Sequence, residues 1–246
     1  MENFFNKQAE EIITPLAEQY NELKDDYKEI FIQAALSIRK ALDDFKPDSP
    51  CLTCNVAGCQ VKDKDIFTDF PNRCKYKDWQ SQAITYLNGD YIQQLKNKFN
   101  ELLAQKDSIS CNKCGACCKL AVSEYSGIQL RQRALKGDKI SEDFIKVFKP
   151  FESIDDARNA NPEYFDLIED SIEDQKAYYY HCPKLDGNLC SDYENRPEFC
   201  KIFPNNPLKL LPSTCSYNQW RKSVLKESLS IKAKLDIIKF YKLKLG

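Results

Sequence analysis

The sequence is poor in the residues that many enzyme sites require. Its 246 residues include one His, His181, and only seven Gly, none of them grouped. A single His excludes two-His zinc protease sites, facial triads and most His-dependent nucleophile triads. Without grouped Gly there is no G-x-G-x-x-G or Walker loop to hold phosphates. These absences exclude large classes of hydrolases and nucleotide-binding enzymes.

The charge balance gives only a weak signal for nucleic acid. Lys and Arg number 36 against 37 Asp and Glu, and only seven of the basic residues are Arg, the best reader of guanine and of the minor groove. No apolar run approaches the roughly 18 residues of a membrane span, and no basic and then apolar leader opens the sequence. We therefore expect a cytoplasmic protein whose partners are neither nucleic acid nor membrane.

Cysteine, by contrast, is abundant: there are twelve, about one residue in twenty. In a secreted chain they would indicate disulfides, but nothing signals export and a chain of this length needs no covalent staples. Several pairs are two residues apart, the spacing at which thiolates on one tight turn reach the same metal. The candidate metal ligands are Cys51, Cys54, Cys59, Cys74, Cys111, Cys114, Cys117, Cys118, Cys182, Cys190, Cys200 and Cys215.

Apolar residues three and four apart predict long amphipathic helices over residues 15–45, about 80–104 and 220–241. The sequence Asn88-Gly89-Asp90 is expected to kink the second of them. Tyr178-Tyr179-Tyr180 predicts a short strand that delivers His181 and Cys182. The predicted fold class is therefore mainly α, with long helices flanking irregular cysteine-rich metal-binding loops and few short strands.

The chain is expected to have two parts. Residues 1–107 form a helical N-terminal region that includes an extra four-Cys segment at 51–79. Residues 108–246 form a metal-chelating domain that ends in the C-terminal helix. Within the second part, residues 119–177 are expected to form short helices and loops.

The densest cysteine run is Cys111-Asn-Lys-Cys114-Gly-Ala-Cys117-Cys118. A C-x2-C-x2-C loop wraps three thiolates around one centre, and Gly115 lets the backbone turn close to the sulfurs. Cys117 and Cys118 are adjacent, so their side chains are expected to diverge. One of the two then serves a second centre, bridges two metals or is a spare thiol.

Downstream the sequence continues as Cys182-Pro-Lys-Leu and ends that stretch at Cys190, followed by a Tyr, Arg196-Pro197 and Cys200-Lys-Ile-Phe-Pro. Together with the first run, this order resembles the YkgJ-type cysteine-cluster family, the zinc- or iron-chelating CxxCxxCC proteins. The resemblance covers about residues 108–216 and leaves out the N-terminal cysteines. It implies that these cysteines bind metal.

The resemblance leaves the role of the metal open. The leading interpretation is a structural or electron-carrying centre that serves an unknown protein client or redox partner. The alternative is an enzyme, either a redox enzyme or a protein methylase like flagellin lysine N-methylase, a relative with a similar cysteine pattern. Metal delivery to a client would use the same thiolates with weaker, exposed ligation.

Spacing does not decide between an iron-sulfur cluster and zinc. The C-x2-C-x2-C run favours iron-sulfur, whereas twelve Cys are three sets of four, the number that a zinc thiolate site uses. In either case more than one centre is expected. His181 is either a ligand beside Cys182 or a packing residue.

An internal repeat lies outside the family pattern. Cys59 and Cys74 are separated by 14 residues, as are Cys200 and Cys215, and each second Cys lies in P-x2-C-x-Y-x2-W. Because a predicted helix follows each copy, Cys74 and Cys215 are expected near helix N-termini, where the helix dipole favours a thiolate. We therefore predict a second site made by Cys51, Cys54, Cys59 and Cys74, equivalent in its C-terminal half to the one closed by Cys200 and Cys215.

Overall fold

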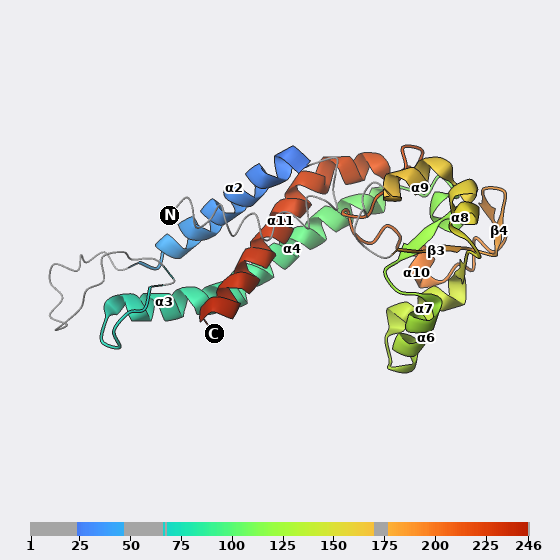
Figure 1. Ribbon diagram of the computed structural model, residues 1–246. Helices are drawn as coiled ribbons and strands as arrows, with labels where there is room; N and C mark the ends of the chain where they lie inside the picture. The colour runs from blue at the N-terminus through green and yellow to red at the C-terminus, as the bar shows by residue number, and fades with distance from the viewer. Residues whose placement is uncertain (1–23, 47–65, 67, 170–176, 246) are drawn as a thin grey trace. The chain divides into compact units, whose positions relative to one another are not determined.

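The computed structural model describes residues 24–46, 66, 68–169 and 177–245. In this part of the chain helices predominate and strands are few and short, which confirms the predicted mainly α fold class (Figure 1). The described chain divides into two compact units. The first unit contains Asp25–Leu102 and the chain from Lys226 onward; the second contains Leu103–Leu225.

The first unit is built from long helices, α2 (Lys24–Asp43), α3 (Lys75–Tyr86), α4 (Ile92–Ala104) and the C-terminal part of α11 (Asn218–Leu245). The apolar residues predicted to line the inner faces of these helices are buried. They are Ile30, Ala34, Ile38, Leu42, Leu87, Tyr91, Leu95, Leu102, Leu229, Ile231 and Ile238. The three predicted helices are therefore confirmed within the described residues, although the second begins at Lys75 instead of residue 80.

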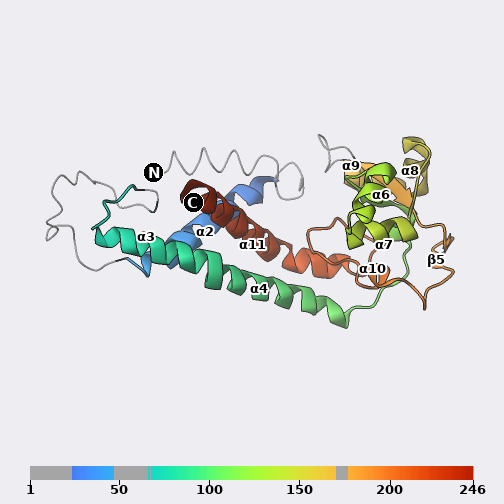
Figure 2. The same ribbon diagram turned by 90° about the horizontal axis from the view of Figure 1, so that it is seen from below.

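Polar contacts join two pairs of these helices, whose course Figure 2 shows. The Trp79 indole Nε1 on α3 donates to the Leu42 carbonyl on α2 over 2.9 Å. On the exposed side, the Lys98 amine of α4 lies 3.6 Å from the Glu227 carboxylate of α11. The buried indole donor has its partner, so burying Trp79 leaves no unsatisfied N–H.

The predicted kink in the second helix takes the form of a π-helical turn, Leu87–Tyr91, between α3 and α4. It contains the Asn88-Gly89-Asp90 sequence. A π turn inserts one residue per turn into the helical ladder, and a Gly is a position where the ladder is easily widened. Leu87 and Tyr91 still face the core, so the turn restores the buried stripe of α4.

The second unit combines short helices with a small antiparallel sheet. Strand β3 (Tyr178–His181) is central and pairs with β1 (Ala121–Ser123) on one side and with β2 (Lys149–Pro150) on the other. The predicted strand at Tyr178 is therefore confirmed. The helices of this region are α5 (Ala116–Lys119), α6 (Gly127–Leu135), α7 (Lys139–Val147), α8 (Ile154–Ala160) and α9 (Pro162–Glu169).

Side-chain caps explain where several of these short helices begin. Ser126 and Gln129 form a reciprocal capping box at α6, while Asp138 caps α7 and Ser153 caps α8. Each cap supplies an acceptor to N–H groups that the helix itself leaves unpaired. Short helices are marginal alone, so these caps help to fix the frame that surrounds the cysteine loops.

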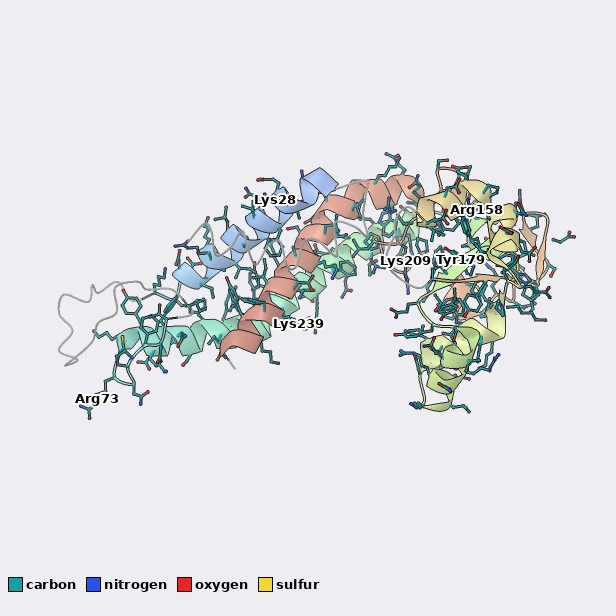
Figure 3. All side chains as sticks on the ribbon, in the orientation of Figure 1. Lys28, Arg73, Arg158, Tyr179, Lys209 and Lys239 are labelled. Atoms are coloured by element: carbon teal, nitrogen blue, oxygen red, sulfur yellow. The ribbon has the colours of Figure 1, made fainter. Side chains whose placement is uncertain are left out.

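Two apolar clusters flank the sheet. One contains Leu120, Ala157, Tyr164, Phe165 and Ile168, and the other contains Leu130, Phe144, Phe148 and Tyr180. The rings of Phe165 and Tyr179 lie 4.8 Å apart, and the Arg158 guanidinium lies 4.7 Å from the Phe165 ring. Figure 3 labels Arg158 and Tyr179 in this region.

The remaining chain of the second unit is mostly irregular. A hairpin joins β4 (Leu185–Asp186) to β5 (Leu189–Cys190), and α10 (Glu198–Lys201) is a single turn. The 3-10 turn Gln105–Ser108 ends the long helix before the first cysteine loop. The predicted irregular, cysteine-rich loops are therefore present.

Within the described ranges, no helix combines the length and the apolar composition needed to cross a membrane.

Candidate metal centre

Nine of the twelve cysteines lie in the described part of the chain, and each of the nine is a free thiol. Eight of them belong to the second unit and are partly buried, whereas Cys74 belongs to the first unit and is buried. Cys51, Cys54 and Cys59 lie outside the described residues. The site can therefore be built from the eight cysteines of the second unit.

The loop that carries Cys111, Cys114 and Cys117 turns through two residues with left-handed backbone. Lys113 has φ 58° and Gly115 has φ 76°. The Lys113 N–H donates to Cys111 Sγ over 3.4 Å, as expected where a backbone wraps around a sulfur. A Cβ on Gly115 would lie 3.1 Å from the Asn188 Cα, so Gly115 is required both by its conformation and by the close approach of the β4–β5 hairpin.

Cys215 is held next to this loop by a set of hydrogen bonds from its neighbours. The Asn112 side-chain amide donates to the Thr214 carbonyl over 2.8 Å, and the Ser216 hydroxyl donates to the Ser110 carbonyl over 2.9 Å. These bonds join residues more than 100 positions apart in the sequence. They fix Cys215 beside the first cysteine run.

The thiols of this region influence one another directly. The Cys215 thiol donates a hydrogen bond to Cys114, which lowers the pKa of Cys114 to about 6 and raises the pKa of Cys215. The pKa of Cys117 is raised by the hydrogen bond with Cys118 and by burial, and the charges of Cys114 and Cys111 act in the same direction. The charge of Cys111 adds likewise to the raised pKa of Cys215. We call Cys111, Cys114, Cys117 and Cys215 the Cys111 group.

A second set of thiols gathers around Cys182. The Cys182 N–H donates to the Cys118 carbonyl over 2.8 Å, so the residue after β3 is joined to the end of the first run. The Leu185 N–H donates to the Cys182 carbonyl over 3.2 Å, and Leu185 is paired with Cys190 across the β4–β5 hairpin. This chain of contacts brings Cys118, Cys182 and Cys190 into one neighbourhood.

Cys200 joins the same neighbourhood from α10. Burial raises the pKa of Cys200 to about 11, and the charges of Cys118, Cys182 and Cys190 act in the same direction. Burial likewise raises the pKa of Cys182, with Cys118 and Cys190 adding to the effect. We call Cys118, Cys182, Cys190 and Cys200 the Cys182 group.

Cys117 and Cys118 lie where the two groups meet. Their thiols hydrogen-bond to each other, which raises the pKa of Cys117 and lowers the pKa of Cys118. The prediction that the two side chains diverge is therefore wrong for the sulfur atoms. Both residues belong to the single turn α5, where successive side chains are about 100° apart, and this angle leaves neighbouring sulfurs within reach of each other.

The donor chemistry of the site fits zinc or iron, because thiolates are the ligands that zinc thiolate sites and iron-sulfur clusters use. The sulfurs are not yet at ligand positions. Among the described residues, no three Cys, His, Asp or Glu side chains stand close enough together to hold a metal ion. Metal binding therefore requires the thiols of a group to come closer together.

Basic side chains that sequence reasoning did not assign lie beside the thiols. Arg196 contributes to lowering the pKa of Cys118, and its guanidinium lies 3.7 Å from the Tyr193 ring. The Lys113 amine lies 4.3 Å from the same ring. The sequence marks Arg196 only as part of the family pattern, because its proximity to Cys118, 78 residues earlier, has no local sequence signal.

A further position that sequence reasoning missed is Lys106. Its amine donates to the Ile202 carbonyl over 2.6 Å and to the Pro204 carbonyl over 2.9 Å. Burial lowers the pKa of this amine. Lys106 therefore ties the segment after Cys200 to the turn before the first cysteine run.

His181 lies at the end of β3, directly before Cys182, as predicted. Its ring is 5.0 Å from the Phe151 ring, and its backbone is paired with Lys149 in β2. The contact with Phe151 gives His181 a packing role.

The internal repeat makes the same turn hydrogen bonds in both copies. The Cys74 N–H donates to the Pro71 carbonyl over 2.8 Å, and the Cys215 N–H donates to the Pro212 carbonyl over 3.0 Å. Cys74 occupies the N-cap position of α3 without a side-chain cap bond, and the Cys215 carbonyl accepts from the N–H of Asn218, the first residue of α11. The expected position of both cysteines at helix N-termini is confirmed.

Comparison with known proteins supports a chelating domain. No curated protein and no solved structure matches the chain. One family model does match, CxxCxxCC, described as "Putative zinc- or iron-chelating domain", over residues 110–223. All eight cysteines of the Cys111 and Cys182 groups lie in the matched range. The predicted resemblance is confirmed, because residues 110–223 match the model of this cysteine-cluster family.

Proposed function

We propose that the chain binds zinc or iron through the thiolates of residues 111–215, and that the bound metal holds the irregular loops of the second unit together. The observation that carries the proposal is the gathering of eight free thiols from four separate stretches of sequence. Thiols so concentrated repel each other once ionised, and a metal cation removes that repulsion. The donor set is soft, which favours zinc and iron-sulfur centres over magnesium or calcium.

A structural role is supported by how little else holds these loops. The described loops contain one two-residue hairpin, single-turn helices and scattered side-chain bonds. A structural zinc site contributes about 10 to 16 kcal/mol of apparent free energy in small peptides, which is comparable with the whole stability of a domain. Free thiols at such density also favour a reducing compartment, so we place the protein in the cytoplasm.

The test is elemental analysis and visible absorption of the full chain purified without oxygen. The matched variants are Cys114→Ser combined with Cys118→Ser, one change in each group, and Ser108→Ala, an exposed hydroxyl in the preceding turn. We expect bound zinc or iron in the wild type and in Ser108→Ala and a large loss in the double variant. A wild-type chain that stays metal-free after anaerobic reconstitution with zinc and with iron and sulfide would overturn the proposal.

The same measurement separates the possible roles. A colourless zinc protein supports the structural role. A brown protein that is reduced and reoxidised reversibly supports an electron-carrying iron-sulfur centre with a protein redox partner, and it would replace the structural role as the proposed function. Use of the centre by an enzyme would in addition require turnover that depends on S-adenosylmethionine or on a redox substrate.

A further inference from the structure

The eight thiols of the second unit are divided by the backbone that supports them. The Cys111 group is stapled by bonds between residues 110–112 and 214–216: the Asn112 N–H donates to the Ser216 hydroxyl over 3.3 Å, and the Ser216 N–H donates to the Asn112 side-chain carbonyl over 3.4 Å. These bonds are additional to the Asn112 and Ser216 bonds described above. All of them lie on the two segments that carry Cys111 and Cys215.

The Cys182 group has a separate set of staples. The Cys182 N–H bond to the Cys118 carbonyl, the Leu185 N–H bond to the Cys182 carbonyl and the β4–β5 hairpin connect three of its members. The Ser191 N–H also donates to the Lys184 carbonyl over 2.8 Å, which closes the base of the hairpin. None of these bonds uses the segment around Cys215.

The two groups also rest on different apolar clusters. Cys114 packs against the cluster of Leu120, Phe165 and Ile168. Cys182 packs against the cluster of Phe144, Phe148 and Tyr180, and so does Phe199, the neighbour of Cys200, whose ring is 6.0 Å from Phe144. Figure 1 shows α10, which carries Phe199 and Cys200, beside α7, which carries Phe144.

Chain geometry gives each group four thiols. In the single turn α5, Cys117 follows the C-x2-C-x2-C spacing that wraps Cys111 and Cys114, whereas the Cys118 carbonyl is bonded to Cys182. Four thiolates complete the coordination of a tetrahedral zinc or a four-iron cluster, so a fifth from the other group is not needed. The boundary then falls at the peptide bond between Cys117 and Cys118.

We propose, on the basis of the metal-binding function above, that the domain holds two adjacent four-thiolate centres. Cys111, Cys114, Cys117 and Cys215 form the first, and Cys118, Cys182, Cys190 and Cys200 form the second. The adjacent Cys117 and Cys118 deliver one thiolate to each, which explains why the pattern ends in two consecutive cysteines.

The positions of basic side chains support two separate centres. A divalent metal with four thiolates is left with two excess negative charges, so two such centres side by side need nearby cations. Lys119 acts on Cys114 in the first centre, and Arg196 acts on Cys118 and Cys200 in the second. Each centre therefore has a basic side chain of its own.

The test maps which cysteines the metal protects. Anaerobically reconstituted full chain is treated with an alkylating reagent, and each modified Cys is identified by mass spectrometry together with metal analysis. Cys215→Ser disrupts the first centre and Cys190→Ser the second, while Cys74→Ser is the matched control at the equivalent motif position outside both centres. Circular dichroism checks that each variant retains its helices.

We expect Cys215→Ser to expose Cys111, Cys114 and Cys117 while Cys182, Cys190 and Cys200 stay protected, and Cys190→Ser to give the reverse. Each variant should lose about half of the metal bound by residues 111–215, and Cys74→Ser should leave all eight cysteines protected. If either single variant exposes both groups at once, the thiols form one shared cluster and the division is wrong. If the reconstituted wild type protects no cysteine and binds no metal, the metal-binding function itself fails, so the two failures are distinguishable.

Discussion

The two copies of the P-x2-C-x-Y-x2-W motif have the same fold and different surroundings. In both, the Cys N–H donates to the Pro carbonyl and the Cys carbonyl accepts from the N–H three positions on. A helix follows in each copy, α3 directly after Cys74 and α11 three residues after Cys215. Both Trp side chains are buried, with Trp79 3% and Trp220 4% exposed. The local sequence therefore determines the turn and the helix start.

The two copies differ in the side chains that surround each Cys. Near Cys74 in the sequence, Phe70, Tyr76 and Trp79 form a set of rings with centroids 5.6 to 6.2 Å apart. Cys215 is hydrogen-bonded to the Cys114 thiol and lies within the influence of Cys111. The comparison teaches that the motif builds a position for a thiol, while segments far away in the sequence decide whether that thiol has other thiols beside it.

Metal removal should produce the largest difference between the two regions. Stripping the metal with a chelator is expected to abolish protease resistance across residues 111–215, because about 10 to 16 kcal/mol of binding free energy exceeds what the loops otherwise have. The helix that begins at Lys75 should stay resistant, since it rests on buried apolar side chains. Limited proteolysis with mass spectrometry measures both. Unchanged resistance at residues 111–215 would show that metal does not hold this region together.

The next largest effect concerns the N-terminal cysteines. Replacing Cys51 and Cys54 by Ser is expected to remove the metal of one centre. The cysteines of the Cys111 and Cys182 groups should stay protected from alkylation. The reason is the repeated spacing, which gives Cys59 and Cys74 the same separation as Cys200 and Cys215. Metal analysis before and after the change is the measurement. An unchanged metal content would mean that the repeat marks a shared helix start alone.

Much of the fold follows from the sequence because it depends on local rules. The 3.6-residue stripes located the buried faces of the long helices, and the helix starts after Cys74 and Cys215 followed from the repeated motif. The left-handed backbone at Gly115 followed from the need for a tight turn between cysteines. Each of these features is decided within a few residues of the chain.

The arrangement of the thiols could not be read in the same way. That Cys215 meets Cys114 and that Cys200 meets Cys118 depends on contacts between segments about 80 to 100 residues apart, for which one sequence has no signal. Successive side chains point in different directions, so the sequence predicts that Cys117 and Cys118 diverge. On one helical turn the two side chains are only about 100° apart, and their short side chains still bring the sulfurs together. The charge beside the thiols, Arg196, was hidden for the same reason.

A smaller effect tests whether the two motif copies are structurally equal. Trp79→Ala and Trp220→Ala should each destabilise the protein by about 3 to 5 kcal/mol, the usual cost of removing a buried Trp. Trp220→Ala alone should also weaken the retention of metal by residues 111–215, because α11 begins with the Asn218 N–H bonded to the Cys215 carbonyl. Denaturant unfolding and metal analysis give the two readouts. An equal loss of metal from residues 111–215 in both variants would show that this site does not depend on the Cys215 copy of the motif in particular.

The smallest expected effect concerns the loop that carries Cys111, Cys114 and Cys117, the thiol neighbours of Cys215. The described surroundings of Cys74 contain no such loop. Gly115→Ala introduces a left-handed Ala, which costs about 1 to 2 kcal/mol, and also places a Cβ 3.1 Å from the Asn188 Cα and 3.2 Å from its carbonyl oxygen. Backbone atoms cannot move aside as a flexible side chain can, so the β4–β5 hairpin must shift. That hairpin carries Cys190.

Gly137→Ala is the matched control, because Gly137 has φ 89° and open space where its Cβ would lie. Both variants should therefore share the cost of the left-handed conformation, and the further loss in Gly115→Ala measures the contact with Asn188. We expect Gly115→Ala to increase the alkylation rate of Cys190 in the metal-loaded chain and Gly137→Ala to leave it unchanged, with the helix that follows Cys74 unaffected in both. Equal stability and equal Cys190 reactivity in the two variants would show that the packing of the hairpin against the first cysteine loop has no part in shaping the site.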